Sequence, residues 1–595
     1  MARQAQGACG VVHVQTSTAS STATATATAR TVGSTCARPT AAPCGDGGRG
    51  RYVPRSPSAS PLFQIIQTHL LDFLAEGRRN SDDGGLPGFV ERELRDFLGC
   101  GSFARGFARF CCDDCRADML VPFSCKGRGF CPSCCGRRMA ELSGHLVDSV
   151  LGGLPIRQWV LTCPWRLRYA MAWDHRLCRA VLAVFIRAVF GLQRRRARRR
   201  GLRCGTGGAV TAIQRAGAAL NLNVHFHSLV ADGVFVADQT GAARFVPLPP
   251  PADGEVARLV DTIRRRVVRL ARRRGIELEQ AEMAIPPSDA LAEDSPLLAG
   301  ICGASVAGRI ATGGRAGRRV QRLRNEPADA AGANGNGSQS RARGTRHAQL
   351  AGFDLHADVF VPAGDLRRLE GLTRYVLRPP VAQGALEIVP SGEILLALRR
   401  PWRDGTCAIV FSPNELIEKL SALVPRPRIN LLLYHGAFAP NARIRRHAVA
   451  NALAQTQSAP LPGASDCASG QDPVPTVGSS GSEPEPPTAP ARTGRGSEPR
   501  PPASPATGPA LPSPVAGRRT GRHPHPSWAE LLRRAWAVDV LACRACGGRL
   551  RLLATIQDPA VVHRVLTHLG LPTESPQPLP ARAPPQSPEL PFPDF

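Results

Sequence analysis

The chain has 595 residues, and 75 lysines and arginines against 47 aspartates and glutamates give it a formal net charge of +28. This length exceeds a single compact domain, which takes roughly 100–200 residues, and the charge favours a phosphate-rich partner such as nucleic acid. No apolar run reaches the roughly eighteen residues that a transmembrane helix needs, so the sequence argues against a membrane protein.

Arginine carries nearly all of the positive charge, because the lysines are Lys126 and Lys419 alone. A GC-rich coding sequence would raise arginine, alanine, glycine and proline together, but it would not explain why the arginines cluster. Guanidinium groups bind phosphate bidentately and stay charged. The N-terminal segment lacks the apolar core of a signal peptide, and several cysteines form C-x-x-C pairs. We therefore expect a protein of a reducing cytoplasm.

Shifts in composition divide the chain into eight expected segments. In chain order these are a disordered tail (1–60), a helical lead-in with a zinc-binding domain (61–150), the first part of a catalytic domain (151–282), a flexible Gly/Ala/Ser-rich insert (283–348), the second part of that domain (349–455), a Pro/Ser/Gly-rich linker (456–526), a small C-terminal C-x-x-C domain (527–575) and a disordered tail (576–595).

Apolar spacing and turn residues predict an irregular mixture of helices and strands. Helices are expected over 61–98, after Cys135, from Asp174 to the arginine run, over 254–274, after Asp365, after a capping box at 527–530 and after Asp558. Strands are expected at 156–162, 208–214, 223–230, 354–361, 385–389, 393–398 and 407–411. Because the two kinds of element do not alternate regularly, the fold class is α+β.

The first cysteine cluster predicts a zinc site. Cys112-x-x-Cys115 and Cys131-x-x-Cys134 are separated by 15 residues, which fits one tetrahedral four-cysteine site in a small ribbon. Three nearby cysteines are alternative ligands, namely Cys111, Cys125 and Cys135. Basic residues surround the cluster and suggest that it contacts DNA: Lys126, Arg128, Arg137 and Arg138.

A second C-x-x-C pair, Cys543-x-x-Cys546, is only half of a zinc site. It could be completed by His563 or His568, or it could be a turn without metal.

The central motif is Val224-His225-Phe226-His227. Side chains alternate across a strand, so His225 and His227 share one face, where they can hold a divalent ion, while Phe226 points to the other. The alternative is two histidines on a solvated strand face. A third ligand would come from Gln214 on the preceding strand, which we prefer, or from His356 on a later one.

Tyr375 is the candidate nucleophile among four tyrosines. It lies on the helix after Asp365, with Arg374 beside it and Arg378 one turn further on. Guanidinium groups and a metal ion could hold and polarise the phosphodiester that its phenol attacks. The alternative is a tyrosine that covers a core helix. Tyr434 is the second choice, although its apolar flank suggests a buried strand.

The densest arginine run has six arginines in seven positions. A helix C-terminus favours some positive charge, but six guanidiniums exceed that need. We expect sequence-independent contacts with the DNA backbone from Arg194, Arg195, Arg196, Arg198, Arg199 and Arg200.

In this order, the cysteine cluster, the H-x-H strand and the downstream helical tyrosine resemble the rolling-circle (HUH) insertion-sequence transposases that carry an N-terminal zinc-binding domain. The similar stretches are SCKGRGFCPSCCGRRMAE (124–141), RQWVLTCPWRLRYAMAWD (157–174), NLNVHFHSLVADGVF (221–235), RYVLRPPVA (374–382), LRRPWRDGT (398–406), YHGAFAPNAR (434–443) and the C-terminal CRACGGRLRLLATI.

The resemblance implies a replication-initiator-like (HUH) domain with a central antiparallel sheet, preceded by a zinc ribbon. It implies that His225 and His227 hold Mg²⁺ or Mn²⁺, and that Tyr375 cuts single-stranded DNA at the transposon end, keeps the 5′ phosphate as phosphotyrosine, and then joins it to target DNA without a nucleotide cofactor. Some members carry two tyrosines four residues apart, whereas here Gly371 stands four residues before Tyr375. The second cleavage then needs either a second subunit in a homodimer or sequential use of one tyrosine.

Two other functions fit parts of the pattern. A non-catalytic zinc-containing DNA-binding protein, either a regulator or an inactive copy, explains the cysteines and the charge but gives His225, His227 and Tyr375 no role. A plasmid replication initiator or relaxase would use the same chemistry as the transposase.

Overall fold

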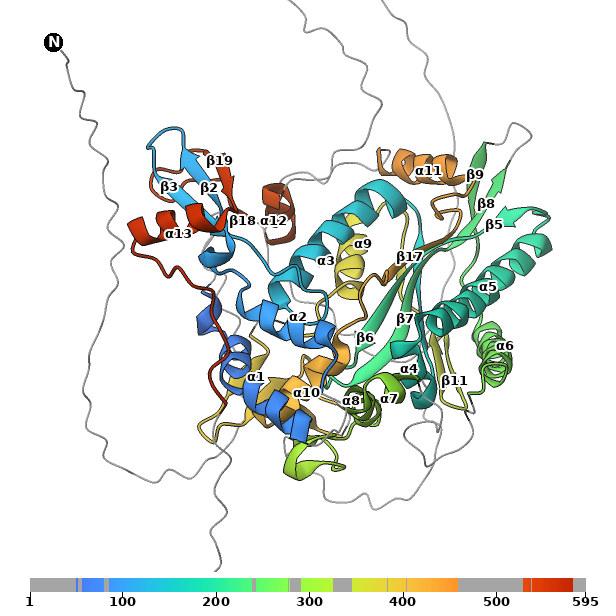
Figure 1. Ribbon diagram of the computed structural model, residues 1–595. Helices are drawn as coiled ribbons and strands as arrows, with labels where there is room; N and C mark the ends of the chain where they lie inside the picture. Colours follow the sequence, from blue (N-terminus) through green and yellow to red (C-terminus); the bar gives the residue numbers. More distant parts are fainter. Residues whose placement is uncertain are drawn as a thin grey trace, which may run out of the picture.

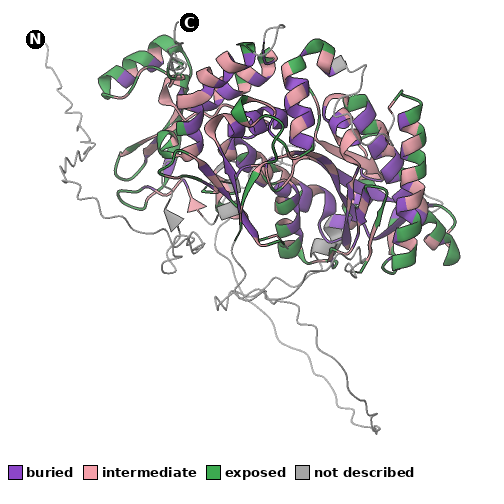
Figure 2. Ribbon diagram, turned by 90° about the horizontal axis from the view of Figure 1, so that it is seen from below, coloured by how far each residue is buried: buried purple, intermediate pink, exposed green. Residues whose placement is uncertain are grey.

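The computed structural model in Figure 1 describes residues 50–51, 56–79, 85–237, 242–276, 278, 290–324, 345–382, 384–402, 404–457, 528–536 and 538–581. Helices and antiparallel sheets are mixed along the chain, which confirms the α+β class. Figure 2 shows buried residues, in purple, along the central strands and on the helix faces turned toward them. Among the described helices, none has the length and the apolar character of a membrane span.

A seven-stranded sheet forms the centre of the molecule. Its order is β11 (His347–Leu350), β12 (Phe353–His356), β4 (Ile156–Thr162), β7 (Leu222–Ala231), β6 (Gly208–Ala216) and β17 (Leu432–Gly436), with β13 (Phe360–Val361) also paired to β4. Every pairing is antiparallel. The strands predicted at 156–162, 208–214 and 223–230 are confirmed, whereas 354–361 is two short strands rather than one.

The two faces of this sheet pack against different helices. Val224 and Phe226 belong to the larger core, which includes buried residues of helices α4 (Trp165–Trp173), α5 (His175–Arg199) and α6 (Asp253–Arg272). Leu229 on the opposite face belongs to a second core, with buried residues of α9 (Leu366–Val376) and α11 (Arg445–Gln457). The alternation along β7 therefore turns His225 and His227 toward the side of the sheet that α9 covers.

Side-chain caps fix where the predicted helices begin. The Asp174 carboxylate accepts from the backbone N–H groups of Arg176 and Leu177 at 2.8 and 3.0 Å, and α5 starts there. Asp365 accepts from the Arg368 N–H at 2.9 Å at the start of α9. The remaining larger helices on the N-terminal side are α1 (Pro61–Arg79), α2 (Gly88–Leu98) and α3 (Pro132–Leu146), which continues as the π-helix η3 (Val147–Leu151).

Smaller sheets flank the central one. The predicted strands over 385–411 form β14 (Leu386–Ile388), β15 (Ile394–Ala397) and β16 (Thr406–Phe411), with β10 (Gln321–Arg324) added beside β16. Strands β5 (Gly205–Thr206), β8 (Gly233–Ala237) and β9 (Ala243–Pro247) form another sheet. Short 3-10 turns are η1 (Pro57–Ala59), η2 (Phe103–Arg105) and η4 (Gly313–Arg315).

The prediction of a flexible insert at 283–348 is wrong for residues 290–324. This part forms α7 (Ala290–Asp294), α8 (Pro296–Val306) and β10. Leu298 and Ile301 of α8 are buried in the larger core, and the Ser305 hydroxyl accepts from the Leu222 N–H at 2.9 Å. Helix α8 is apolar on all sides, which is typical of a buried helix. Its glycine, alanine and serine residues are also common in flexible segments, and this composition led to the wrong prediction. Residues 325–344 lie outside the described part.

The prediction of a small C-terminal domain at 527–575 is also wrong, because its strand joins a sheet of the N-terminal part. Strand β19 (Leu550–Ile556) pairs with β2 (Phe107–Cys112), which pairs in turn with β3 (Asp118–Pro122). Figure 1 shows these red and light-blue strands side by side. Helices α12 (Trp528–Trp536) and α13 (Pro559–His568) flank the sheet, and β18 (Val538–Asp539) pairs with β1 (Gly50–Arg51). The predicted cap Ser527 and residues 458–526 lie outside the described part.

A buried ion pair holds α10 (Pro413–Leu423) in the core. The ammonium of Lys419 donates to the Glu418 carboxylate at 2.7 Å and to the Arg309 carbonyl, and both side chains are fully buried. The second carboxylate oxygen accepts from the backbone N–H groups of Ala311 and Thr312 at 2.9 and 3.0 Å.

We expect Lys419→Met to destabilise the protein by about 3–5 kcal/mol, because Glu418 would be left as an uncompensated buried charge. Urea unfolding at pH 7 measures this free energy. The matched control is Lys126→Met, at an exposed lysine, which should stay within about 0.5 kcal/mol of the parent. Equal losses in the two variants would contradict the role given to the buried pair.

Candidate active site and metal sites

The two histidines of β7 lie side by side. The ring centroids of His225 and His227 are 4.8 Å apart, with an angle of 63° between the ring planes. Burial, opposed by a backbone hydrogen bond, lowers the pKa of His225. Burial, together with the neighbouring His225 and Arg378, lowers the pKa of His227 to about 3. Both imidazoles are therefore neutral at pH 7, which is the form that binds a metal ion.

Hydrogen bonds orient both rings. Nδ1 of His225 lies 2.7 Å from the Asn223 carbonyl oxygen, so Nδ1 carries the proton and Nε2 keeps its lone pair. Nδ1 of His227 lies 2.7 Å from the side-chain amide of the buried Gln158 on β4. A turn of this amide by 180° would let its oxygen accept from Nδ1–H and leave Nε2 of His227 as a ligand too. The pair thus fits a divalent ion.

Tyr375 stands next to this pair, in the last turn of α9. Its ring centroid is 6.1 Å from that of His227, and the rings meet edge to face at 79°. Leu372 and Val376 on the same helix are buried, whereas Tyr375 is 44% exposed. The guanidinium carbon of Arg378 lies 4.6 Å from the tyrosine ring centroid. The predicted phenol, the two imidazoles and Arg378 are therefore brought together, whereas the predicted Arg374 is half-buried on α9 and is not among the residues that line the neighbouring cleft.

The two candidate third ligands differ in position. Gln214 on β6 is directly opposite His225 in the strand register, so it lies on the same face. Its amide nitrogen donates to the Val376 carbonyl of α9, which leaves the amide oxygen as the ligand atom it could offer. His356 on β12 is paired with Val160 of β4, which is itself paired with His227, so a whole strand separates the two histidines. The geometry favours Gln214.

The other tyrosines are less suited to this site. Tyr169 on α4 is 3% exposed and belongs to the larger core, as expected of a packing residue. Tyr434 lies on the outermost strand β17, where it is half-buried with the Arg445 guanidinium carbon 5.6 Å from its ring. Tyr52 lies outside the described residues.

A large cleft of about 1410 Å³ opens beside Tyr375. Its lining includes Gln214, Arg378 and Trp402, and five further arginines, namely Arg128, Arg138, Arg215, Arg399 and Arg400. Reasoning from the sequence missed the contribution of Trp402, Arg399 and Arg400, which stand in the similar stretch at 398–406. It also missed Gln158, and Arg168, whose guanidinium donates to the Asn223 side chain at 3.1 Å and lowers the pKa of His225.

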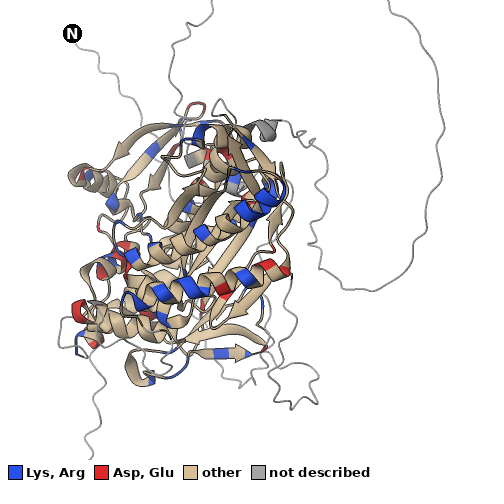
Figure 3. Ribbon diagram, turned by 90° about the vertical axis from the view of Figure 1, so that its right-hand side faces the viewer, with Lys and Arg blue, Asp and Glu red and all other residues tan. Residues whose placement is uncertain are grey.

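The arginine run lies elsewhere, at the C-terminal end of α5 and across the sheet from the two histidines. Arg196 donates to the Pro250 carbonyl at 2.9 Å and lies 3.4 Å from Glu255, so part of its role is to join α5 to α6. The other arginines of the run are exposed. Between α5 and α6 lies a groove of about 600 Å³ whose lining includes Glu255, Asp261 and seven arginines, namely Arg187, Arg194, Arg195, Arg199, Arg258, Arg265 and Arg266. Figure 3 shows the basic side in blue along both helices.

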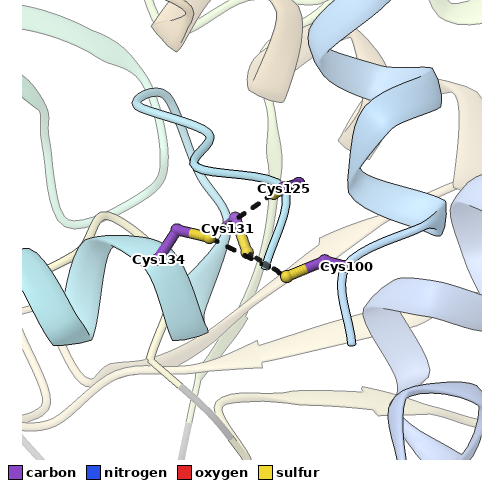
Figure 4. A group of neighbouring side chains, drawn as sticks. All are labelled: Cys100, Cys125, Cys131 and Cys134. Carbon is purple, nitrogen blue, oxygen red and sulfur yellow. Dashed lines mark hydrogen bonds between the residues drawn. The ribbon is translucent and has the colours of Figure 1, made fainter. Parts of the chain in front are cut away.

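The predicted zinc site is wrong in its grouping, because its four cysteines belong to two clusters. Cys131 and Cys134, at the start of α3, lie with Cys100 and Cys125 (Figure 4). Cys112 and Cys115 lie with Cys543 and Cys546. Strand β3 carries the chain away from Cys115 before Cys131 is reached, so nearness in sequence did not mean nearness in space. Cys100 was missed because it belongs to no C-x-x-C pair.

The first cluster has the geometry of a four-cysteine zinc site. The Sγ–Sγ distances are 3.6 Å for Cys100–Cys131, 3.8 Å for Cys100–Cys134 and 3.5 Å for Cys125–Cys134. Zinc bound at about 2.3 Å to four sulfurs separates them by about 3.8 Å. Helix α3 then runs from this cluster to α9, where the Ser143 and Thr373 hydroxyls are 2.6 Å apart. The cluster thereby anchors the helix that supports Tyr375.

The low pKa of His227 gives a prediction for stability. The pKa of His227 in the folded protein, about 3, lies below the usual 6.5. The contribution of His227 to the free energy of unfolding is therefore full above about pH 6.5 and is lost as the pH falls toward 3. Without added Mg²⁺ or Mn²⁺, we expect His227→Gln to lose less stability than the parent between pH 6.5 and 4.5. Plotted against pH, the free energies of unfolding of the parent and of His227→Gln should differ in slope by up to about 1.4 kcal/mol per pH unit. Urea midpoints at several pH values measure it, and parallel profiles would contradict it.

Two family models match parts of the chain. Residues 208–446 match a family model described as a putative transposase, and this stretch contains the two histidines and Tyr375. Residues 65–163 match a model described as a transposase zinc-binding domain, which contains the whole first cysteine cluster. No curated protein and no solved structure matches the chain. The chain belongs to the rolling-circle insertion-sequence transposases that carry an N-terminal zinc-binding domain.

Proposed function

We propose that this transposase cuts and rejoins single-stranded DNA through a phosphotyrosine formed on Tyr375. The observation that carries the proposal is the position of Tyr375, whose ring is 6.1 Å from that of His227 and open to a cleft. A phosphodiester placed in the cleft could contact the phenol, whose ring lies next to the imidazole pair.

We assign the catalytic domain to the HUH class. Two features support this assignment. Strand β7, which carries the H-x-H motif, lies inside an antiparallel sheet between β4 and β6, and helix α9 places Tyr375 next to the histidines on that strand. The domain would comprise residues 151–282 and 349–455. The buried helix α8, which contacts Leu222, extends it to part of the intervening segment.

The reaction follows from the groups at the site. The phenolic oxygen of Tyr375 attacks the phosphorus, the bond from phosphorus to the 3′ oxygen breaks, the phenolic proton passes to solvent, and the leaving 3′ oxygen takes up a proton. A 3′ hydroxyl that attacks the phosphotyrosine reverses these steps and restores the phenol. When bound, Mg²⁺ or Mn²⁺ supplies charge stabilisation for the scissile phosphate and the leaving oxygen.

The chain's own residues have separate roles in this scheme. His225, His227 and Gln214 would hold the metal ion, with Asn223 and Gln158 orienting the rings. Arg378 lies over the Tyr375 ring and would hold the phosphate in line for attack.

The cleft suits a single strand. Its arginines Arg128, Arg138, Arg399 and Arg400 come from two parts of the chain and can contact successive phosphates. The guanidinium of Arg322 lies over one face of the Trp402 ring, 4.8 Å from its centroid, and an unpaired base could stack on the opposite face. Arg128 and Arg138 belong to the zinc-binding domain, so that domain would form one wall of the DNA path.

The groove between α5 and α6 would bind flanking DNA. Its arginines contact no catalytic residue and suit a sequence-independent grip on the backbone. With one tyrosine at the site, the second cleavage would use a second subunit or the same tyrosine again. The position one turn before Tyr375, where some family members carry a second tyrosine, is occupied here by Gly371, and the space around that residue is open.

The proposal is tested with labelled single-stranded DNA carrying the transposon end. In the presence of Mn²⁺, we expect a covalent protein–DNA adduct that survives a denaturing gel and carries label placed 3′ of the cut. Fully duplex DNA of the same sequence should give much less. Nicked products without any adduct would rule out a covalent tyrosine intermediate.

A further inference from the structure

Four cysteines far apart in the sequence meet outside the first cluster. Cys112 ends β2 and Cys115 follows it, whereas Cys543 and Cys546 precede β19. The Sγ atoms of Cys112 and Cys546 are 3.5 Å apart although 434 positions separate the two residues in the sequence. Cys115 and Cys543 are 3.6 Å apart at Sγ, and all four sulfurs lie within 4.8 Å of one another. Cys543 and Cys546 lie outside both stretches that match family models.

The two C-x-x-C turns have the same backbone geometry. In the first, the Cys112 N–H donates to the Ala117 carbonyl at 2.9 Å, and the Arg116 N–H donates to the Cys112 carbonyl at 3.1 Å. In the second, the Cys543 N–H donates to Gly548 at 2.7 Å, and the Gly547 N–H donates to Cys543 at 2.9 Å.

The residue after the second cysteine has a positive φ in each turn, 61° at Arg116 and 78° at Gly547. Two such turns facing each other form the two halves of a zinc ribbon.

The strands next to the turns fix this arrangement. Leu550, the first residue of β19, is paired with Cys112, the last residue of β2. Phe110, Cys112, Cys543 and Leu550 are buried together in a small core. Sulfur separations of 3.5 and 3.6 Å between the turns fit the edge of about 3.8 Å in a tetrahedral zinc–sulfur centre.

His563 and His568, the alternative partners predicted for Cys543 and Cys546, lie at the other end of the sheet. His563 and His568 are exposed on α13. The buried residues of that helix, Val562 and Leu566, pack against Phe107 at the start of β2. Cys112 ends the same strand, about 16 Å away at the usual rise per residue.

We propose a second structural zinc site formed by Cys112, Cys115, Cys543 and Cys546, which joins the C-terminal segment to the N-terminal zinc-binding domain. Neither half is a site alone, so the N-terminal domain is complete only with the last part of the chain. Helix α12, which precedes Cys543 in the chain, contacts α9, the helix that carries Tyr375: Arg534 of α12 donates to Glu370 of α9 at 3.0 Å. The site does not depend on the proposed DNA chemistry.

The zinc content of full-length variants tests the shared site. We expect two zinc ions per chain in the parent, and one in both Cys112→Ser/Cys115→Ser and Cys543→Ser/Cys546→Ser. The combined variant with all four changes should also hold one, because both pairs serve the same ion. Zero zinc in the combined variant, or two in either pair variant, would overturn the proposal. The matched control Cys111→Ser, next to Cys112 but outside both clusters, should keep two.

A second measurement on the unaltered chain remains decisive if a variant fails to fold. Cys115 and Cys546 are exposed, so as free thiols they would react with iodoacetamide as fast as the exposed Cys204, which lies in neither cluster. We expect them to resist alkylation while zinc is bound, and all four cysteines to become reactive together on chelation. Immediate alkylation of Cys115 or Cys546 in the zinc-loaded protein would contradict a shared ion.

Discussion

Replacing Tyr375 by phenylalanine is expected to abolish the covalent protein–DNA adduct and to lower the rate of strand cleavage by at least about 10⁴-fold, as loss of a nucleophile does in other enzymes. The change removes a single oxygen atom from a side chain that is 44% exposed, so folding and DNA affinity should not change. The adduct is measured on a denaturing gel, and affinity for the same DNA by fluorescence anisotropy.

The matched control for this variant is Tyr434→Phe. Tyr434 lies at the sheet edge, half-buried, and should keep both adduct and cleavage. If the adduct persists in Tyr375→Phe and disappears in Tyr434→Phe, the nucleophile has been assigned to the wrong tyrosine.

The second large effect is expected at the histidine pair. His225→Ala/His227→Ala should lower Mn²⁺-dependent cleavage by about 10³-fold, equivalent to about 4 kcal/mol of lost transition-state stabilisation. The two rings lie 4.8 Å apart and are neutral, so both can contribute to one ion. Calorimetric titration with Mn²⁺ should show that its binding is lost as well.

The control for the pair is His356→Ala. This histidine lies on the same sheet face but one strand further away, and its loss should change cleavage by no more than a few-fold. A His356→Ala variant as inactive as the double variant would indicate a different ligand set. Full activity in the double variant would remove the metal ion from the mechanism.

Much of the fold could be predicted from the sequence because local patterns specify it. Alternation along 223–230 put His225 and His227 on one face and Phe226 on the other, and Phe226 is fully buried. The caps Asp174 and Asp365 marked where α5 and α9 begin. Such features depend on neighbours within a few residues, which a sequence displays directly.

Long-range pairing was the part that could not be predicted. The grouping of the cysteines depends on β19 adding to β2, and no local pattern relates residue 550 to residue 112. Similarly, the small residues of α8 are as compatible with a flexible segment as with the buried helix they form. The hydrogen bond between Gln158 and His227 depends on the register of β4 with β7, which local sequence patterns do not specify.

The central claim is that Tyr375 itself becomes joined to DNA, and peptide mapping of the trapped adduct tests it most directly. Trypsin cleaves after Arg374 but not after Arg378, which precedes Pro379, so the nucleophile would lie in the peptide 375–399, and the Tyr434 peptide would span 429–443. After nuclease digestion, mass spectrometry should find a nucleotide linked through its 5′ phosphate to the peptide 375–399. The same modification on the peptide 429–443, or on neither peptide, would contradict the account.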